Sequence, residues 1–296
     1  MALVQPKTQT LRLLLAHAFL LALCAAVVFP FLIVISVSLR PGNFASGSLI
    51  PSSISFEHWR YVLGLDVTGP DGQPMQPDLP VLLWLWNSVK VAAMSATVTL
   101  LLSTTASYAL ARIRFRGRRQ LLTGLMLMQM FPAVLALVAI YAIFDRIGSA
   151  FPAIGLNTHA SLVLAYSGGI AMHVWTLKGY YDTLPTEIEE AARVDGARPW
   201  QAFWRVLLPM AVPILVVIFM LAFIGAVIEY PVASVLLSQQ DQLTLAVGSK
   251  LFVQEHNFRW GDFAAAALLS GLPITAVFLL AQRWMIAGLA AGGVKG

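Results

Sequence analysis

Long apolar runs alternate with short polar segments along the whole chain. The hydrocarbon core of a bilayer is about 30 Å thick, so a helix needs about 20 apolar residues to cross it. Six runs are close to or above that length, at residues 13–39, 83–111, 121–144, 159–177, 207–237 and 263–282. The pattern therefore predicts an all-α, polytopic membrane protein with six transmembrane helices.

Polar segments separate the expected helices. The longest, residues 40–82, contains Gly69-Pro70-Asp71-Gly72, a combination that breaks helices and forms turns. The same alternation predicts connectors at 112–120, 145–158, 178–206 and 238–262, with terminal segments at 1–12 and 283–296.

Composition agrees with a membrane location. Hydrophobic residues make up 58% of the 296 residues and charged residues only 11%, against about 25% charged residues in soluble domains. A globule of this length cannot bury so much apolar surface, so membrane lipid must cover part of it. The net charge of +5 does not indicate nucleic acid, because the basic residues lie at the ends of apolar runs and not in one patch.

The distribution of lysine and arginine predicts the orientation. With both termini in the cytoplasm, 13 of these residues lie inside and 6 outside, as the positive-inside rule requires. Most of the asymmetry comes from the run 112–119, which contains five arginines. We interpret this run as a topology anchor; a site for anionic lipid is the alternative.

Catalytic motifs are absent from the sequence. It contains no H-E-x-x-H or G-x-S-x-G pattern, no metal-ligand spacing and no G-x-x-x-x-G-K-[ST] loop for a nucleotide. The single cysteine, Cys24, cannot form an intrachain disulfide. We therefore expect a protein that is not an enzyme and has no cofactor or metal of its own. If ATP drives it, a partner chain binds the ATP and its Mg²⁺.

The charged segment before the fifth apolar run predicts two short helices. Thr186 and Glu189 fit a capping box at the start of the first helix, and Gly196 fits the left-handed position that ends it. Pro199 fits the first turn of the second. That second helix has one apolar face at helical spacing, formed by Trp200, Phe203 and Leu207.

The first of these helices has a small apolar patch, made of Ile188, Ala191 and Ala192 beside Glu190. Such a patch can enter a groove on another protein. The alternative is an amphipathic helix that rests on the membrane surface, but the acidic side chains would be repelled by anionic headgroups.

The same segment carries a family resemblance. It resembles the EAA loop of ABC-importer permeases at Glu190, Ala191, Ala192, Asp195, Gly196, Ala197, Leu208 and Pro209. The resemblance implies that these residues belong to a coupling helix, which fits a cleft on an ATP-binding subunit.

Other segments are similar to the carbohydrate-importing branch of that family, and within it to the importers of maltose and maltodextrin. These are Ser38-Leu39-Arg40, Asn87-Ser88, Phe131-Pro132, Trp260-Gly261-Asp262-Phe263 and the glycine-rich tail. The resemblance implies that the tail contacts the ATP-binding subunits through Gly292, Gly293, Val294, Lys295 and Gly296. The sequence pattern that is typical of this branch after the fifth run is shortened here to Ile228-Glu229-Tyr230. We therefore do not assign to this chain the substrate contacts that the branch makes at that position.

The resemblance also implies partners and a location. The partners are a second permease subunit, a dimer of ATP-binding subunits and a periplasmic sugar-binding protein, at the bacterial inner membrane. In the 238–262 segment, candidate contacts with the binding protein are Gln254, Glu255, His256 and Asn257. A solvated connector would have the same composition.

Glu229 is the one ionisable residue deep in an expected span, 207–237. A carboxylate there is costly unless it is paired or faces water, so we expect a gate or pore-wall residue near Pro231. The alternative places it at the outer interface, in contact with solvent.

The expected function is therefore half of an ATP-driven sugar pathway, in which closure of the ATP-binding subunits moves the 186–208 helices as levers. An ABC permease for another solute is the first alternative. An ion-coupled carrier is less favoured, because it needs a network of buried charges and inverted repeats.

Overall fold

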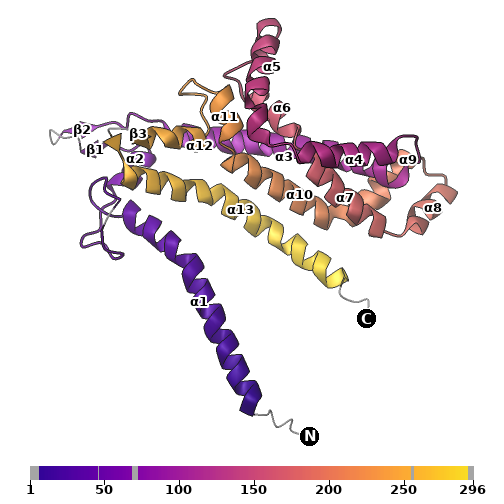
Figure 1. The fold of residues 1–296 in the computed structure, drawn as a ribbon, viewed down its shortest axis with the longest axis horizontal. Coiled ribbons are helices and arrows are strands. Elements are labelled where there is room, and N and C mark those ends of the chain that lie inside the picture. Colours follow the sequence, from indigo (N-terminus) through magenta and orange to yellow (C-terminus); the bar gives the residue numbers. More distant parts are fainter. Residues whose placement is uncertain (1–6, 46, 69–72, 255–256, 293–296) are drawn as a thin grey trace. The chain divides into compact units, whose positions relative to one another are not determined.

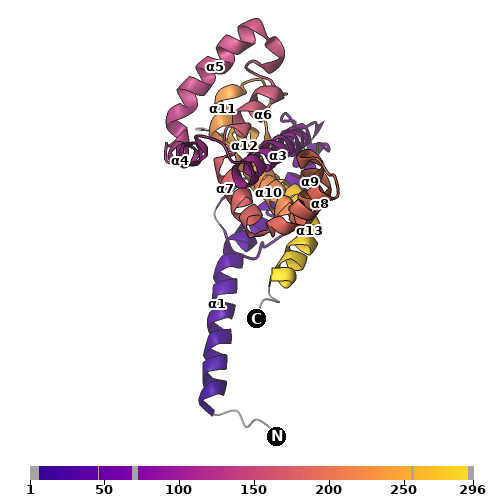
Figure 2. The ribbon, with the colours of Figure 1, turned by 90° about the vertical axis from the view of Figure 1, so that its right-hand side faces the viewer.

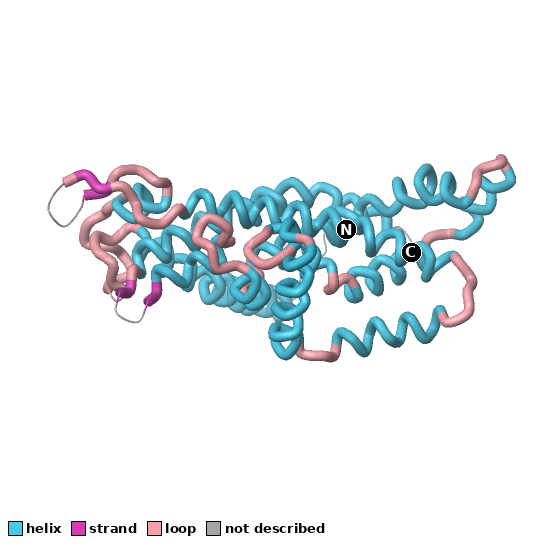
Figure 3. The backbone as a smooth tube through the Cα atoms, turned by 90° about the horizontal axis from the view of Figure 1, so that it is seen from above, coloured by secondary structure: helices cyan, strands magenta, loops and turns pink. Residues whose placement is uncertain are grey.

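The computed structural model describes residues 7–45, 47–68, 73–254 and 257–292, and most of them are helical (Figure 3). The chain divides into two compact units. The first comprises Met1–Pro80 and Leu251–Leu269, and the second comprises Val81–Lys250 and Ser270–Gly296. The strands described form two short antiparallel pairs, β1 (Val67–Thr68) with β2 (Pro74–Met75) and β3 (Val253–Gln254) with β4 (Asn257–Phe258).

Four helices of the described chain are long and apolar enough to cross a membrane, over Leu11–Ser38, Val81–Arg112, Pro199–Ile228 and Trp260–Trp284. They correspond to α1 (Lys7–Ser38), α3 (Val81–Arg112), α10 (Leu208–Ile228) with the turns before it, and α13 (Trp260–Gly292). Two bent helix pairs raise the number to six if each pair is one span. The expected all-α membrane fold is confirmed, while the orientation of the termini stays a prediction.

The bent pairs lie where the third and fourth spans are expected. The first joins α4 (Arg118–Gln129), through the 3-10 turn η1 (Ala133–Ala136), to α5 (Leu137–Ala150), with a bend of 88°. The second joins α6 (His159–Ser167) to α7 (Ala171–Thr183), with a bend of 50°. Proline lacks a backbone N–H, so Pro132 explains the first break. Gly168 and Gly169 occupy the second.

The fifth expected span, 207–237, is not one helix. Helix α10 ends at Ile228, and a separate helix, α11 (Pro231–Leu236), begins after two intervening residues. Pro231 occupies the first turn of α11, a position where its missing N–H costs nothing. Because the residues on both sides of this break are apolar, hydropathy alone does not reveal it.

Helix α3 is the centre of the second unit. It runs beside α10 and α7 (Figure 1) and also contacts α6. Small residues on α3 allow close packing, as is usual between membrane helices: Ala92 and Ala96 are buried with Phe223, Ala226 and Val227 of α10. Helix α5 extends away from this packed group and contacts α11 (Figure 2).

The first unit contains α1, the short helix α2 (Glu57–Val62), the start of α13 and both strand pairs. No residue in the most apolar window of α1 is buried. Its apolar side chains therefore need lipid or a partner's helices to cover them. The short helix α12 (Leu245–Gly248) belongs to the second unit, and the chain returns to the first unit within the 3-10 turn η4 (Ser249–Phe252).

Candidate functional site

The EAA-like segment folds into two short helices joined by a turn. Helix α8 covers Thr186–Val194 and α9 covers Pro199–Ala202. Gly196 has a φ of 88°, a left-handed conformation that favours glycine, and the N–H of Ala197 donates to the carbonyl of Ala192 at 2.9 Å. Pro199 is in the first turn of α9. The local geometry predicted for Gly196 and Pro199 is thus confirmed.

The start of α8 differs from the prediction. The capping position is Pro185 and no side chain caps the helix, so the capping box of Thr186 and Glu189 does not form. Glu189 instead turns inward and pairs with Arg112, the last residue of α3, at 2.6 Å between Oε1 and Nε. Arg112 Nη2 also donates to the carbonyl of Leu184 at 3.0 Å. The carboxylate therefore joins α8 to α3 and is not available to cap its own helix.

The opposite surface of α8 remains exposed. Ile188 is 40% exposed and Val194 is 88% exposed, and Glu190 and Ala191 beside them are exposed as well. An apolar surface bordered by charged residues is typical of a site where another protein binds.

Helix α9 continues into α10 through a π-helical turn, Phe203–Leu207. Phe203 and Leu207 are each 1% exposed, and the Phe203 ring centroid lies 4.5 Å from that of Tyr108 on α3. Trp200 is 59% exposed, but its ring centroid lies 5.4 Å from that of Phe203, so the apolar face predicted for these residues is only partly buried. A π-helical turn contains an additional residue. Leu208 and Pro209 occupy the first turn of α10.

Glu229 lies directly after α10, where the chain becomes extended. Its Oε1 accepts from the N–H of Val232 at 2.8 Å, and its Oε2 accepts from the N–H of Ala233 at 3.0 Å. The Tyr166 hydroxyl also donates to Oε2 at 2.8 Å. The carboxylate therefore stabilises the start of α11 and links it to α6.

A cavity of about 210 Å³ borders this carboxylate. Its lining is both polar and apolar: Ser95, Thr99, Tyr166, His173 and Glu229, with Leu221, Ala222, Gly225 and Ala226. Thr99 and Ser95 are at most 5% exposed. Glu229 therefore lies beside a cavity that several polar side chains line, within a group of otherwise apolar helices.

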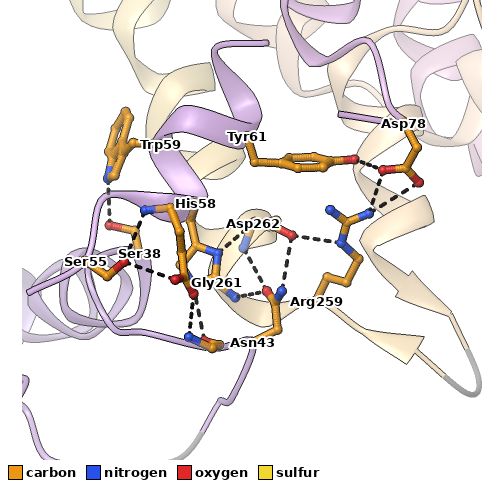
Figure 4. A network of polar contacts seen from close by, with 12 residues as sticks. Ser38, Asn43, Ser55, His58, Trp59, Tyr61, Asp78, Arg259, Gly261 and Asp262 are labelled. Carbon is orange, nitrogen blue, oxygen red and sulfur yellow. Dashed lines mark hydrogen bonds and ion pairs between the residues drawn. The ribbon is translucent and has the colours of Figure 1, made fainter. Parts of the chain in front are cut away.

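The first unit contains a polar network around Asp262, in the first turn of α13 (Figure 4). Asp262 is 3% exposed. Its Oδ1 lies 2.7 Å from His58 Nδ1, and its Oδ2 accepts from Arg259 Nε at 2.8 Å. The Arg259 guanidinium lies 4.1 Å from the centroid of the Tyr61 ring and pairs with Asp78 at 3.1 Å.

Charged and hydrogen-bonding neighbours shift the pKa values of His58 and Asp78 in this network. Burial alone would lower the pKa of His58, but the hydrogen bond and negative charge of Asp262, with the charge of Glu57, raise it above the ordinary value. For Asp78, burial alone would raise the pKa, but hydrogen bonds from Tyr61 and Arg259 bring it below the ordinary value. A methyl group at Gly261 would overlap the His58 ring, so glycine is required there.

The network adjoins the candidate contacts with a binding protein. Gln254 and Asn257 pair across β3 and β4, and the N–H of Arg259 donates to the carbonyl of Phe252 at 2.8 Å. Glu255 and His256 lie outside the described residues. At the other end of α13, Gly292 is the last helical residue, and the remaining tail candidates, Gly293, Val294, Lys295 and Gly296, also lie outside the described part of the chain.

Comparison with known proteins gives a family and close relatives. Residues 75–290 match the family model described as binding-protein-dependent transport system inner membrane component. The chain is 60% identical to the maltose/maltodextrin transport system permease protein MalG of Yersinia pestis, over 100% of this chain and 98% of the relative. It is also 60% identical to the MalG of Salmonella typhimurium and 59% identical to that of Escherichia coli K12, each over the full length of both chains.

The fold also matches a solved structure. A chain of a bacterial ABC transporter involved in the import of the acidic polysaccharide alginate aligns with a TM-score of 0.75 and 20% identity. The alignment covers 94% of this chain and 98% of that chain. At this identity the match establishes the fold alone.

Proposed function

The chain belongs to the family of binding-protein-dependent transport system inner membrane components, and we propose that it is the permease subunit of an ATP-driven maltose/maltodextrin importer. It is a multi-pass protein of the inner membrane. The observation that carries the proposal is full-length identity of 60% to relatives named for maltose and maltodextrin transport. In this role the chain supplies half of the pathway, and a second, MalF-like permease supplies the other half.

The motor of this importer lies in partner chains. A dimer of ATP-binding subunits holds ATP and Mg²⁺, and its closure moves α8 and α9. The docking segment is Glu190, Ala191, Ala192, Asp195, Gly196 and Ala197, continued by Leu208 and Pro209. The exposed apolar surface of α8, with Val194 at 88% exposure, supports this role because a docked partner would remove it from water. The tail Gly292–Gly296 contacts the same dimer.

Two further sites complete the proposal. Glu229 is a gate or pore-wall residue, a role supported by the cavity beside it, which other polar side chains also line. Gln254, Glu255, His256 and Asn257 contact a periplasmic sugar-binding protein, which delivers substrate from outside. The support for this contact is the polar character of the four residues, of which Gln254 and Asn257 pair across β3 and β4 beside Arg259.

The docking assignment is tested by Gly196→Pro in the full complex. Proline fixes φ near −65°, whereas Gly196 has a φ of 88°, so the variant should lose co-purification with the ATP-binding subunits. Gly64→Pro is the matched control, because Gly64 has a φ of 69° and lies in the first unit. Its N–H donates to the Tyr61 carbonyl at 3.0 Å, as that of Gly196 does to the Arg193 carbonyl at 3.0 Å. Normal co-purification of the Gly196 variant would refute the assignment.

The substrate is tested separately, by uptake of labelled maltose and maltotriose in a complex reconstituted with all partners. An ABC permease for another solute is the alternative. It predicts ATP-dependent uptake of a different compound from a panel of sugars, amino acids and phosphate, with neither maltose nor maltotriose transported.

A further inference from the structure

Helix α3 holds both coupling helices through its carboxyl end. Arg112 and Tyr108 are one turn apart, so they project from the same face. Arg112 pairs with Glu189 of α8 at 2.6 Å, and the Tyr108 ring packs on Phe203, directly after α9, at 4.5 Å between centroids. Any displacement of α8 and α9 must therefore act on this end of α3.

The amino end of α3 contacts a loop without regular secondary structure. Residues 237–244, between α11 and α12, form no helix or strand; we call them the 237–244 loop. Trp84 Nε1 donates to the Gln240 carbonyl at 2.7 Å. Asn87 Nδ2 donates to the carbonyls of Asp241 at 2.9 Å and Leu243 at 3.0 Å.

Two more contacts reinforce this attachment. The hydroxyl of Ser88 accepts from the N–H of Leu245 at 2.8 Å, and a methyl group at Gly248 would overlap the ring of Trp84. Trp84, Asn87 and Ser88 are at most 2% exposed. Because buried backbone groups need hydrogen-bond partners, these side chains help to determine where the loop lies. Asn157 and His159, at the start of α6, hold it as well: Asn157 Oδ1 accepts from the N–H groups of Ser238 at 2.6 Å and Gln239 at 3.0 Å, and His159 Nε2 lies 2.9 Å from the Gln242 carbonyl oxygen.

The helix between these two ends is suited to transmit force. Three of the four long described helices contain an internal proline, Pro30 in α1, Pro213 in α10 and Pro273 in α13. The 32-residue sequence of α3 contains neither proline nor glycine, the residues at which helices usually kink. At about 1.5 Å per residue, Trp84 and Arg112 are about 40 Å apart along the axis. Figure 1 shows α3 extending from α12 to α8 and α9.

We propose that α3 is a rigid link that transmits movement of the coupling helices to the 237–244 loop, with Arg112 and Asn87 as positioning residues at its two ends. Neither residue needs to touch ATP or sugar. Arg112 determines whether α3 follows α8, and Asn87 determines whether the loop follows α3. The inference rests on the proposed function, because it takes the ATP-binding subunits as the source of the movement.

The test follows the loop directly with a thiol reagent. The only cysteine, Cys24, is replaced in Cys24→Ser, and Gln239→Cys then places one thiol on the exposed part of the loop. In the complete complex in lipid nanodiscs, the rate of thiol modification is measured without nucleotide and with a non-hydrolysable ATP analogue. The intact link should give different rates in the two states.

Variants at each end then break the link. Arg112→Met with Glu189→Leu removes the ion pair without leaving one charge buried alone, and Asn87→Leu removes both donors to the loop. Each should abolish the nucleotide-dependent rate difference and lower uptake per ATP hydrolysed by about 5- to 150-fold, the usual range of coupling between sites. ATP hydrolysis itself should remain, because the exposed surface of α8 is unchanged.

A charge reversal separates coupling from folding. Glu189→Arg alone should uncouple transport from hydrolysis, and Arg112→Glu added to it should restore coupling. Thr105→Ala is the control on α3, since Thr105 is exposed and its hydroxyl bonds only to Leu101 and Leu102 of its own helix; it should change nothing.

The outcomes distinguish the link from the function on which it rests. If the ATP-binding subunits fail to bind the unmodified chain, the proposed function is wrong. If they bind but the loop thiol reacts equally in both nucleotide states, the link is refuted. It is also refuted if the assembled Arg112→Met, Glu189→Leu complex keeps both the rate difference and normal uptake per ATP.

Discussion

Arg112 and Glu189 form an ion pair 2.6 Å long between Nε and Oε1, with side chains only 9% and 5% exposed. The two residues are 77 positions apart in the sequence. Glu190, the next residue, is exposed. Two adjacent carboxylates therefore serve different purposes: one fixes α8 to its own chain, and the other faces outward from α8.

This division gives a first prediction. Glu189→Ala leaves the guanidinium of Arg112 buried without its partner, so the chain should lose about 3–5 kcal/mol of stability. Glu190→Ala should change stability by no more than about 0.5 kcal/mol, as is usual at the surface, but weaken binding of the ATP-binding subunits. Thermal unfolding of the purified chain and co-purification check the two effects. Equal effects of both variants on stability would contradict the assignment.

A second prediction concerns the carboxylate at the end of α10. Glu229→Gln keeps an oxygen that can accept a hydrogen bond at the start of α11 but removes the negative charge beside the cavity. The complex should assemble normally, with altered maltose uptake or altered ATP hydrolysis in the absence of the binding protein. Tyr166→Phe is the matched variant, because it removes the 2.8 Å hydrogen bond to Glu229 and keeps the charge. Unchanged uptake and hydrolysis in the Glu229 variant would exclude the gate role.

The third prediction concerns pH. The pKa of His58 is raised in the folded chain, against burial, by Asp262 and Glu57. The pair's stabilising contribution should therefore be complete below the unfolded value of about 6.5 and be lost as pH rises through the folded pKa. The apparent melting temperature should fall over that window. In His58→Gln this fall should be absent, even though Arg259 and Asp78 remain in place; a fall of the same size would assign the pH dependence to another group.

The fourth prediction concerns packing at the other end of α3. Gly248→Ala places a methyl group where the Trp84 ring lies, so it should destabilise the chain by about 1–3 kcal/mol through overpacking. Gly225→Ala is the matched control, since nothing lies within 4 Å of an added methyl group there. Differential scanning fluorimetry in detergent compares them. A neutral Gly248 variant would show that α12 can move away from Trp84 at little cost.

Local features could be predicted well from the sequence. Gly196 and Pro199 are typical helix-ending and helix-starting residues, and both occupy those positions. Long apolar runs predicted the all-α membrane fold, because membrane thickness fixes the length of a span. Glu229 attracted attention because a carboxylate within an apolar run needs a partner, and it has three.

Contacts between distant segments could not be predicted. Asn87-Ser88 belonged to the family resemblance without a role, because its role depends on carbonyl and N–H groups more than 150 positions away. In the sequence, Arg112 cannot be distinguished from the other four arginines of the 112–119 run. Only the fold shows that it pairs with Glu189 of α8. The helix break after Ile228 was not predicted, because mean hydropathy does not change where the backbone changes direction.

The π-helical turn over Phe203–Leu207 affects the direction in which α8 faces. Each residue of an α-helix turns the chain by about 100°, so one surplus residue rotates everything before it by about that angle around the axis of α10. If the same residues were wound as a regular α-helix, α8 would face a different side of α10. The direction in which the docking surface faces is therefore set by the backbone geometry of this turn, independently of which side chains form that surface.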